Sequence, residues 1–120
     1  MSQKKSVLLA DDQSSIRSLI KTIVNNLGGE VIDEAENGFE AVEKFKAKKP
    51  DLVLLDINMP VMDGVEALSK ILAEDPSALV AMLTSQNTME VVKKCASLGA
   101  KYFVLKNSAE DITKELTKLL

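Results

Sequence analysis

Residues 51–64 read DLVLLDINMPVMDG, and this stretch leads from an uninterrupted apolar run to a carboxylate at Asp56 and then to a turn. An apolar run without polar alternation is typical of a strand that is buried on both faces, as in parallel sheets. The same pattern occurs near the start of the chain, where SVLLA (residues 6–10) precedes Asp11 and Asp12. Because ligands bind at the carboxyl ends of parallel strands, we expect these acidic side chains to share one crevice.

Short apolar runs alternate with segments of helical periodicity along the whole chain. Between successive runs, apolar residues recur at the three- and four-residue spacing of a helix face. The runs predicted as strands are Ser6–Ala10, Glu30–Ala35, Asp51–Asp56, Leu79–Thr84 and Tyr102–Lys106. Five strands that alternate with five helices favour right-handed crossovers and a parallel sheet covered on both faces, which is an α/β three-layer sandwich.

Four predicted helices are preceded by a residue that can cap a helix, with an acidic residue three positions later. The pairs are Asn37 with Glu40, Asp63 with Glu66, Asn87 with Glu90 and Ser108 with Asp111. A capping side chain accepts a hydrogen bond from a free N–H group of the first turn, and the acidic residue suits the positive end of the helix dipole. The pairs therefore predict where these helices begin.

Length and composition restrict the classes of protein to consider. A chain of 120 residues is long enough for one core, and we expect a single domain over residues 1–120. The net charge of −3 gives no reason to expect nucleic-acid binding, which needs a basic surface. No apolar stretch approaches the roughly 20 residues that span a membrane, and the first apolar run is too short for a secretory signal.

Cysteine and histidine usage narrow the chemistry further. Cys95 is the single cysteine, which excludes an intramolecular disulfide and fits a cytoplasmic protein. Its helical spacing with Val92 and Leu98 predicts an inert buried thiol, with redox sensing as the alternative. The absence of histidine excludes a Ser-His-Asp or Cys-His catalytic set, so any phosphohistidine chemistry must use a partner's histidine.

The residues at the predicted strand ends can support phosphoryl transfer. Clustered carboxylates repel one another and normally need a cation or shared protons, and an oxygen-only pocket favours Mg²⁺. A carboxylate such as Asp56 can attack a phosphoryl group and become an acyl phosphate. The Thr84 hydroxyl can donate a hydrogen bond to that group, and the charges of Mg²⁺ and Lys106 balance those of the carboxylates.

Each residue also has an ordinary structural interpretation. Asp11 or Asp12 alone would most often be a helix cap, and Asp63 is best explained as a cap and turn residue. Thr84 alone would be a β-branched strand residue, and Lys106 alone would be a solvated lysine. The complete set at these spacings is hard to obtain from capping alone.

Taken together, these residues closely resemble the receiver domain of bacterial two-component response regulators. The matching elements are Asp11-Asp12, the segment Asp56–Gly64, the Thr84-Ser85 step, the turn at residues 99–101 and Lys106. The resemblance spans the whole chain. It implies a flavodoxin-like (βα)5 fold with a parallel five-stranded sheet in the order 2-1-3-4-5.

The resemblance implies a Mg²⁺-dependent phosphorylation site. Asp56 would be the phosphoacceptor and would also contact the metal. Asp11 and Asp12 would organise Mg²⁺, with Asp12 favoured as the direct ligand, and the backbone carbonyl of Asn58 would complete the protein ligands. Asn58 and Gln86 would flank the path of the attacking water and tune the lifetime of the phosphorylated state.

The resemblance also implies a switch that reads the phosphoryl group. Lys106 would pair with this group, and Thr84 would be the hydroxyl drawn toward it. Tyr102 matches the aromatic residue that turns inward when Thr84 moves, with a half-buried strand aromatic as the alternative. Asn107 departs from the family pattern, which usually has proline after the lysine, often in a cis bond. A non-proline cis bond costs about 2.5–4 kcal/mol, so either a trans bond with a reshaped loop or a strained cis bond remains open.

The implied function is a signalling switch. A histidine kinase would donate the phosphoryl group, and phosphorylation would change the face built from the fourth helix, fifth strand and fifth helix, through which a downstream protein binds. Lys93, Lys94 and Lys101 near this face could meet an acidic partner, or could simply be solvated. The protein would be no enzyme beyond its own phosphorylation and dephosphorylation. We expect neither direct nucleic-acid binding nor membrane association.

A chemotaxis-type single-domain regulator is the favoured form of this function. The alternatives are a receiver domain cut from a longer regulator and an interaction module that is not phosphorylated. A flavin carrier is disfavoured because the acidic loop at Asp11-Asp12 would repel the cofactor phosphate. A metal-dependent phosphatase would need further active-site elements.

Overall fold

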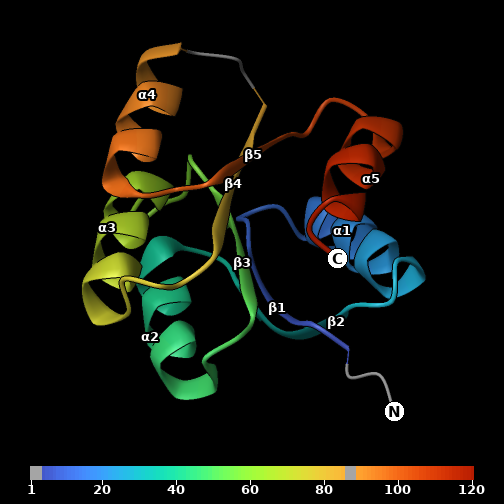
Figure 1. The fold of residues 1–120 in the computed structure, drawn as a ribbon, viewed down its shortest axis with the longest axis horizontal. Helices are drawn as coiled ribbons and strands as arrows, with labels where there is room; N and C mark the ends of the chain where they lie inside the picture. Colours follow the sequence, from blue (N-terminus) through green and yellow to red (C-terminus); the bar gives the residue numbers. More distant parts are fainter. Residues whose placement is uncertain (1–3, 86–88) are drawn as a thin grey trace.

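The computed structural model describes residues 4–85 and 89–120, in which strands and helices alternate strictly (Figure 1). The strands are β1 (Ser6–Ala10), β2 (Glu30–Ala35), β3 (Leu52–Asp56), β4 (Val80–Thr84) and β5 (Tyr102–Leu105). The helices are α1 (Ser14–Asn26), α2 (Gly38–Lys48), α3 (Gly64–Glu74), α4 (Met89–Leu98) and α5 (Ala109–Thr117). Every predicted strand is confirmed, with ends that differ by at most one residue.

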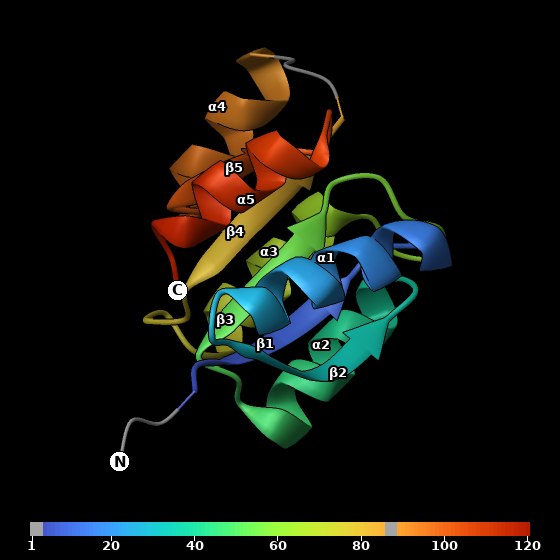
Figure 2. The same ribbon diagram turned by 90° about the vertical axis from the view of Figure 1, so that its right-hand side faces the viewer.

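All strand pairs are parallel, and the order β2-β1-β3-β4-β5 confirms the predicted flavodoxin-like sheet. Helices α2, α3 and α4 cover one face of the sheet, and α1 and α5 cover the other (Figures 1 and 2). The chain leaves β1 toward β2 and later returns to the opposite side of β1 as β3. Connections that diverge in this way open a crevice at the carboxyl ends of the two central strands.

The central strands are buried on both faces, which accounts for their uninterrupted apolar sequences. In β3, Val53 and Leu55 belong to the core beneath α2, α3 and α4, whereas Leu52 and Leu54 belong to the core beneath α1 and α5. In α4 the one buried residue is Cys95, and burial raises the pKa of its thiol. The predicted burial of this cysteine is therefore confirmed.

The cap signals account for three helix starts. Side chains of Asn37, Asp63 and Ser108 accept hydrogen bonds from the N–H groups three residues later, at 2.8, 2.9 and 3.1 Å. The predicted cap at Asn87 lies outside the described residues. The N-cap of α1 is Gln13, whose side chain makes no capping hydrogen bond, so the capping interpretation of Asp11 and Asp12 is wrong.

Two further expectations concern the backbone and the membrane. The peptide bond between Lys106 and Asn107 is trans. Of the two alternatives for this bond, trans with a reshaped loop or strained cis, the structure therefore has the first. Among residues 4–85 and 89–120, no helix is both long and apolar enough to cross a bilayer.

Candidate functional site

The carboxyl ends of β1 and β3 bring the predicted acidic residues together. Asp11 and Asp12 follow β1, and Asp56 is the last residue of β3. One carboxylate oxygen from each of them lies within 4.8 Å of the others. Asp11 and Asp56 are buried, whereas Asp12 is exposed. A single cation can bridge oxygens at this spacing, and the all-carboxylate donor set suits a hard ion such as Mg²⁺.

Lys106 extends from the end of β5 into this cluster. Its Nζ lies 2.9 Å from Oδ2 of Asp11 and 3.2 Å from Oδ1 of Asp56, and its side chain is only 9% exposed. Burial alone would lower the pKa of this ammonium group, but the hydrogen bond to Asp11 and the charges of both carboxylates outweigh that effect and raise it. The solvated-lysine interpretation is therefore wrong for Lys106.

Asp56 is a buried carboxyl group with a raised pKa. Burial, followed by repulsion from the Asp11 charge, raises the pKa of its carboxyl from 3.8 to about 6, although Lys106 opposes the shift. The backbone N–H of Asn58 donates a long hydrogen bond of 3.4 Å to Oδ1 of Asp56. A pKa near 6 still leaves most of the Asp56 carboxyl groups ionised at neutral pH.

Asp11 is held by hydrogen bonds on every polar group. Its N–H donates to Ala35 O at 3.0 Å, and its Oδ1 accepts from the N–H of Gln13 at 2.9 Å. Its Oδ2 accepts from Lys106, and its backbone carbonyl accepts from Nη1 of Arg17 at 2.6 Å. A carboxylate that is engaged at both oxygens organises its neighbours more readily than it binds a new ligand directly.

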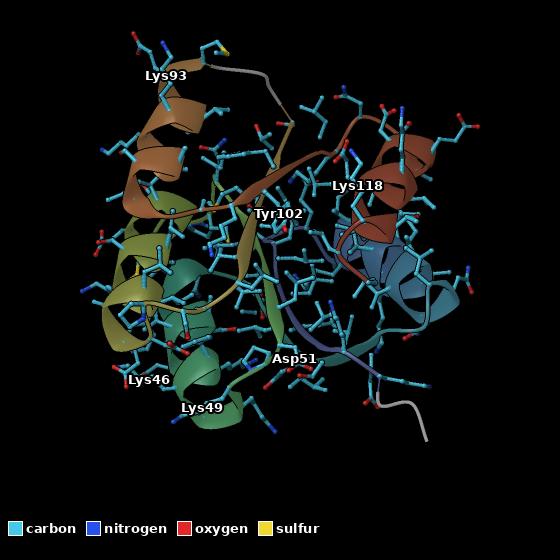
Figure 3. The ribbon with its side chains drawn as sticks, in the orientation of Figure 1. Lys46, Lys49, Asp51, Lys93, Tyr102 and Lys118 are labelled. Atoms are coloured by element: carbon cyan, nitrogen blue, oxygen red, sulfur yellow. The ribbon has the colours of Figure 1, made fainter. Side chains whose placement is uncertain are left out.

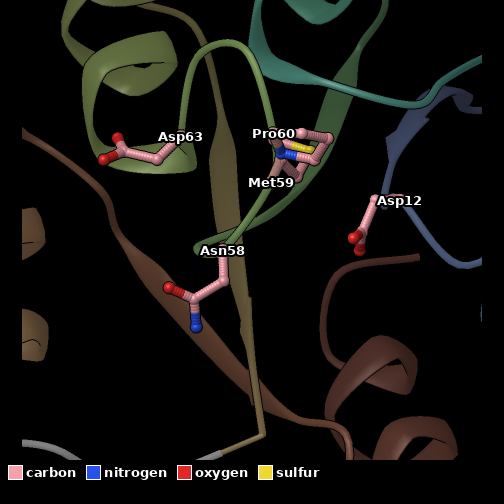
Figure 4. A pocket seen from close by; sticks show the side chains of 5 residues that line it. All are labelled: Asp12, Asn58, Met59, Pro60 and Asp63. Carbon is pink, nitrogen blue, oxygen red and sulfur yellow. The ribbon is translucent and has the colours of Figure 1, made fainter.

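Asp12, by contrast, lines an open pocket with Asn58, Met59, Pro60 and Asp63 (Figure 4). Figure 4 shows the Asp63 carboxylate directed away from Asp12, in agreement with its role as the cap of α3. The pocket thus presents Asp12 and the loop after β3 to a ligand, and the two residues predicted to bind the metal, Asp12 and Asn58, both line it. Gln86 lies outside the described residues.

Close backbone contacts fix the loop after β3. The N–H of Gly64 donates to Ile57 O at 2.8 Å, and a Cβ atom at Gly64 would lie 2.0 Å from the carbonyl oxygen of Asp56. Only glycine fits a contact this short. The N–H of Gly38 donates to Met62 O at 2.8 Å, which ties the start of α2 to the same loop.

The sheet faces favour Phe103 over Tyr102 as the aromatic residue beside Thr84, and the predicted partnership of Thr84 and Tyr102 stays a prediction. Side chains alternate between the faces of a strand, so Thr84 lies on the same face as Met82, which belongs to the core beneath α2, α3 and α4. Tyr102 shares its face with Val104, in the opposite core, and is 40% exposed. Phe103 packs against the core that contains Met82 and is therefore the aromatic residue on the Thr84 face.

Comparison with known proteins agrees with the fold and the site. Residues 7–117 match the model of the response regulator receiver domain. The chain belongs to this family. The receiver domain is 48% identical over 100 residues to the chemotaxis protein CheY of Listeria monocytogenes, with 83% of this chain and 84% of that protein covered. It is 40% identical over 115 residues to CheY of Bacillus subtilis, with 95% and 96% covered.

A solved structure extends the comparison to three dimensions. The receiver domain superposes with a TM-score of 0.90 on a chain of the CheX–CheY–BeF3–Mg²⁺ complex from Borrelia burgdorferi. The identity is 34%, and the match covers 96% of this chain and 88% of that chain. The acidic pocket of the receiver domain is consistent with aspartate phosphorylation and with Mg²⁺ binding.

Proposed function

We propose that this receiver domain takes a phosphoryl group from the phosphohistidine of a histidine kinase onto Asp56 and thereby changes its contacts with a downstream protein. One observation carries the proposal: Asp56, at the end of a central strand, lies 3.2 Å from Lys106 and shares a crevice with Asp11 and Asp12. This arrangement supplies a nucleophile, a fixed ammonium group and a cation site.

The chemical step needs little covalent help from the protein. Lys106 and the N–H of Asn58 both contact Oδ1 of Asp56, so we assign the attack to Oδ2. An Oδ2–phosphorus bond forms, the phosphorus–nitrogen bond breaks, and its electron pair returns to the imidazole ring of the kinase. Hydrolysis later transfers the phosphoryl group to water and restores the carboxylate. The receiver domain therefore catalyses only its own phosphorylation and dephosphorylation.

The residues of the pocket have distinct proposed roles. Asp12, Asp56 and the carbonyl of Asn58 would hold Mg²⁺, which when bound neutralises negative charge on the phosphoryl oxygens. Asp11 orients Lys106 through the 2.9 Å contact and completes the acidic cluster. The ammonium group of Lys106 neutralises a further phosphoryl oxygen. Asn58 and Gln86 would orient the attacking water in dephosphorylation.

The proposed switch connects the pocket to a binding face. Thr84, at the end of β4, would donate its hydroxyl to the phosphoryl group, and Phe103 on the same sheet face would repack in response. The responsive face is built from α4, β5 and α5. Near it, Lys93, Lys94 and Lys101 are exposed and could meet an acidic partner; Figure 3 labels Lys93 and Tyr102 in this region.

The relatives suggest the pathway. Chemotaxis proteins named CheY cover most of the chain, and the Borrelia burgdorferi structure pairs a CheY with CheX. We therefore propose a chemotaxis role with a downstream protein as the target, and a cytoplasmic location, which the lone Cys95 fits.

Intact-mass measurement tests the chemistry directly. Incubation with Mg²⁺ and acetyl phosphate should add one phosphoryl group to the parent protein and none to the Asp56→Asn variant. Asp12→Ala should weaken Mg²⁺ binding in a calorimetric titration. Asp63→Asn is the matched control, because asparagine also caps a helix and the residue lies in the same loop. A parent protein that gains no mass from acetyl phosphate or from its kinase would instead be an interaction module that is not phosphorylated.

A further inference from the structure

Arg17, on α1, connects the acidic loop after β1 to the edge strand β2. Its Nη1 donates to the backbone carbonyl of Asp11 at 2.6 Å, and its Nε donates to Oε1 of Glu34 at 3.0 Å. The side chain is 15% exposed, so water competes weakly for these contacts. A guanidinium group presents its donors in a rigid plane, and two contacts in different directions therefore fix its position.

We propose that Arg17 is a positioning residue for the metal site, an inference that rests on the proposed function. The carbonyl of Asp11 and the nitrogen of Asp12 belong to one planar peptide unit. By fixing that carbonyl, Arg17 fixes the orientation of the plane and with it the direction in which the Asp12 carboxylate leaves the backbone. Asp12 is the exposed member of the acidic cluster, so its direction depends most on the backbone.

Two neighbouring contacts argue against a purely electrostatic role for Arg17. Lys21 lies 3.7 Å from Oε2 of Glu34, so Glu34 has a second cation nearby. The backbone N–H of Arg17 donates to Gln13 O at 3.1 Å, which fixes Arg17 in the first turn of α1, directly after the acidic loop. Among the described residues, Arg17 rather than Lys21 supplies the hydrogen bond to the Asp11 carbonyl.

Magnesium titration of the full chain tests the assignment. Loss of residues that orient metal ligands typically weakens metal binding about 10–100-fold, so Arg17→Ala should raise the Mg²⁺ Kd about tenfold. Arg17→Lys keeps the charge but cannot make both contacts, so its Kd should fall between those of the parent and the alanine variant. Lys21→Ala is the matched control, since it removes the other cation beside Glu34, and its Kd should stay within about twofold of the parent.

Two further measurements separate positioning from general stability. In metal-free protein, hydrogen exchange of the Gln13 amide, which donates to Asp11, should be faster in Arg17→Ala, while amides of β3 remain unchanged. Phosphorylation by acetyl phosphate should slow in this variant at low Mg²⁺ and recover at saturating Mg²⁺.

The outcomes distinguish this inference from the proposed function. A folded Arg17→Ala protein with the parent's Kd would overturn the inference alone, as would a phosphorylation defect that saturating Mg²⁺ does not relieve. If Arg17→Ala does not fold, Arg17→Lys decides, and a parent-like Kd in that variant overturns the inference. A parent protein that binds no Mg²⁺ would overturn the proposed function and this inference with it.

Discussion

Replacing Asp56 with asparagine should stabilise the metal-free protein at neutral pH. The residue is 4% exposed, and burial with the Asp11 charge raises the pKa of its carboxyl from 3.8 to about 6. Each pKa unit corresponds to about 1.4 kcal/mol, so the ionised group costs the folded state about 3 kcal/mol. Asparagine removes this cost, and the pKa of about 6 already includes the opposing contact of Asp56 with Lys106. We therefore expect a net gain of about 2–3 kcal/mol at neutral pH.

The pH dependence of this gain follows from its cause. Because the pKa is higher in the folded state, folded protein binds the proton more tightly than unfolded chain does. The parent therefore loses stability as pH rises from 3.8 to about 6, and the full cost is present above that range. Asparagine does not titrate, so the advantage of Asp56→Asn should be nearly absent near pH 4 and fully developed at pH 7.5.

Urea unfolding in EDTA, followed by far-ultraviolet circular dichroism because the chain has no tryptophan, measures the difference. Asp63→Asn, in the same loop, should show no comparable gain. Mg²⁺ should stabilise the parent by mass action and should stabilise Asp56→Asn less. Added Mg²⁺ should therefore reduce the difference in unfolding free energy between the two proteins. The reasoning fails if Asp56→Asn is less stable than the parent at pH 7.5, or if its gain is equal at pH 4 and pH 7.5.

Four other predictions address the switch, the loop and the thiol. Thr84→Ala should still gain a phosphoryl group, as measured by mass spectrometry, but phosphorylation should not increase its affinity for the target. An increase as large as that of the parent protein would exclude the switch role of Thr84. Phe103→Ala should reduce the phosphorylation-dependent gain in target binding more than Tyr102→Ala does in the same assay. The reverse order would assign the switch role to Tyr102. Gly64→Ala should destabilise the fold by about 1–3 kcal/mol in urea, because its Cβ would lie 2.0 Å from a backbone oxygen. Cys95, buried and with a raised thiol pKa, should react with a thiol reagent only after unfolding, and rapid labelling of native protein would contradict this.

The acidic pocket could be predicted because its parts follow from strand chemistry. A run such as Leu52–Leu55 is stable only between two apolar layers, and parallel strands place their carboxyl ends at one edge. Asp11 and Asp56 therefore had to meet once the strand order was known. Their spacing, within 4.8 Å, is the part of the prediction with the strongest physical basis.

Other features depended on packing that a linear pattern does not contain. The contact between Arg17 and Glu34 joins a helix to an edge strand, and nothing in the spacing of the two residues indicates it. The choice between Tyr102 and Phe103 depends on which face of β5 each side chain occupies, and residue type alone does not indicate the face. Phe103 lies on the Thr84 face because of the two-residue alternation of the strand alone.

The adjacent carboxylates Asp11 and Asp12 have different roles because the backbone places one in the interior and the other at the surface. Asp11 is 0% exposed and has both carboxylate oxygens engaged, by the N–H of Gln13 and the ammonium of Lys106. Asp12 follows immediately and is exposed, although one of its carboxylate oxygens lies within 4.8 Å of one from Asp11. A buried, saturated carboxylate fixes the lysine, and an exposed one remains available to a cation. Because Arg17 holds the peptide between them, the same bond that orients Asp12 also keeps these two roles separate.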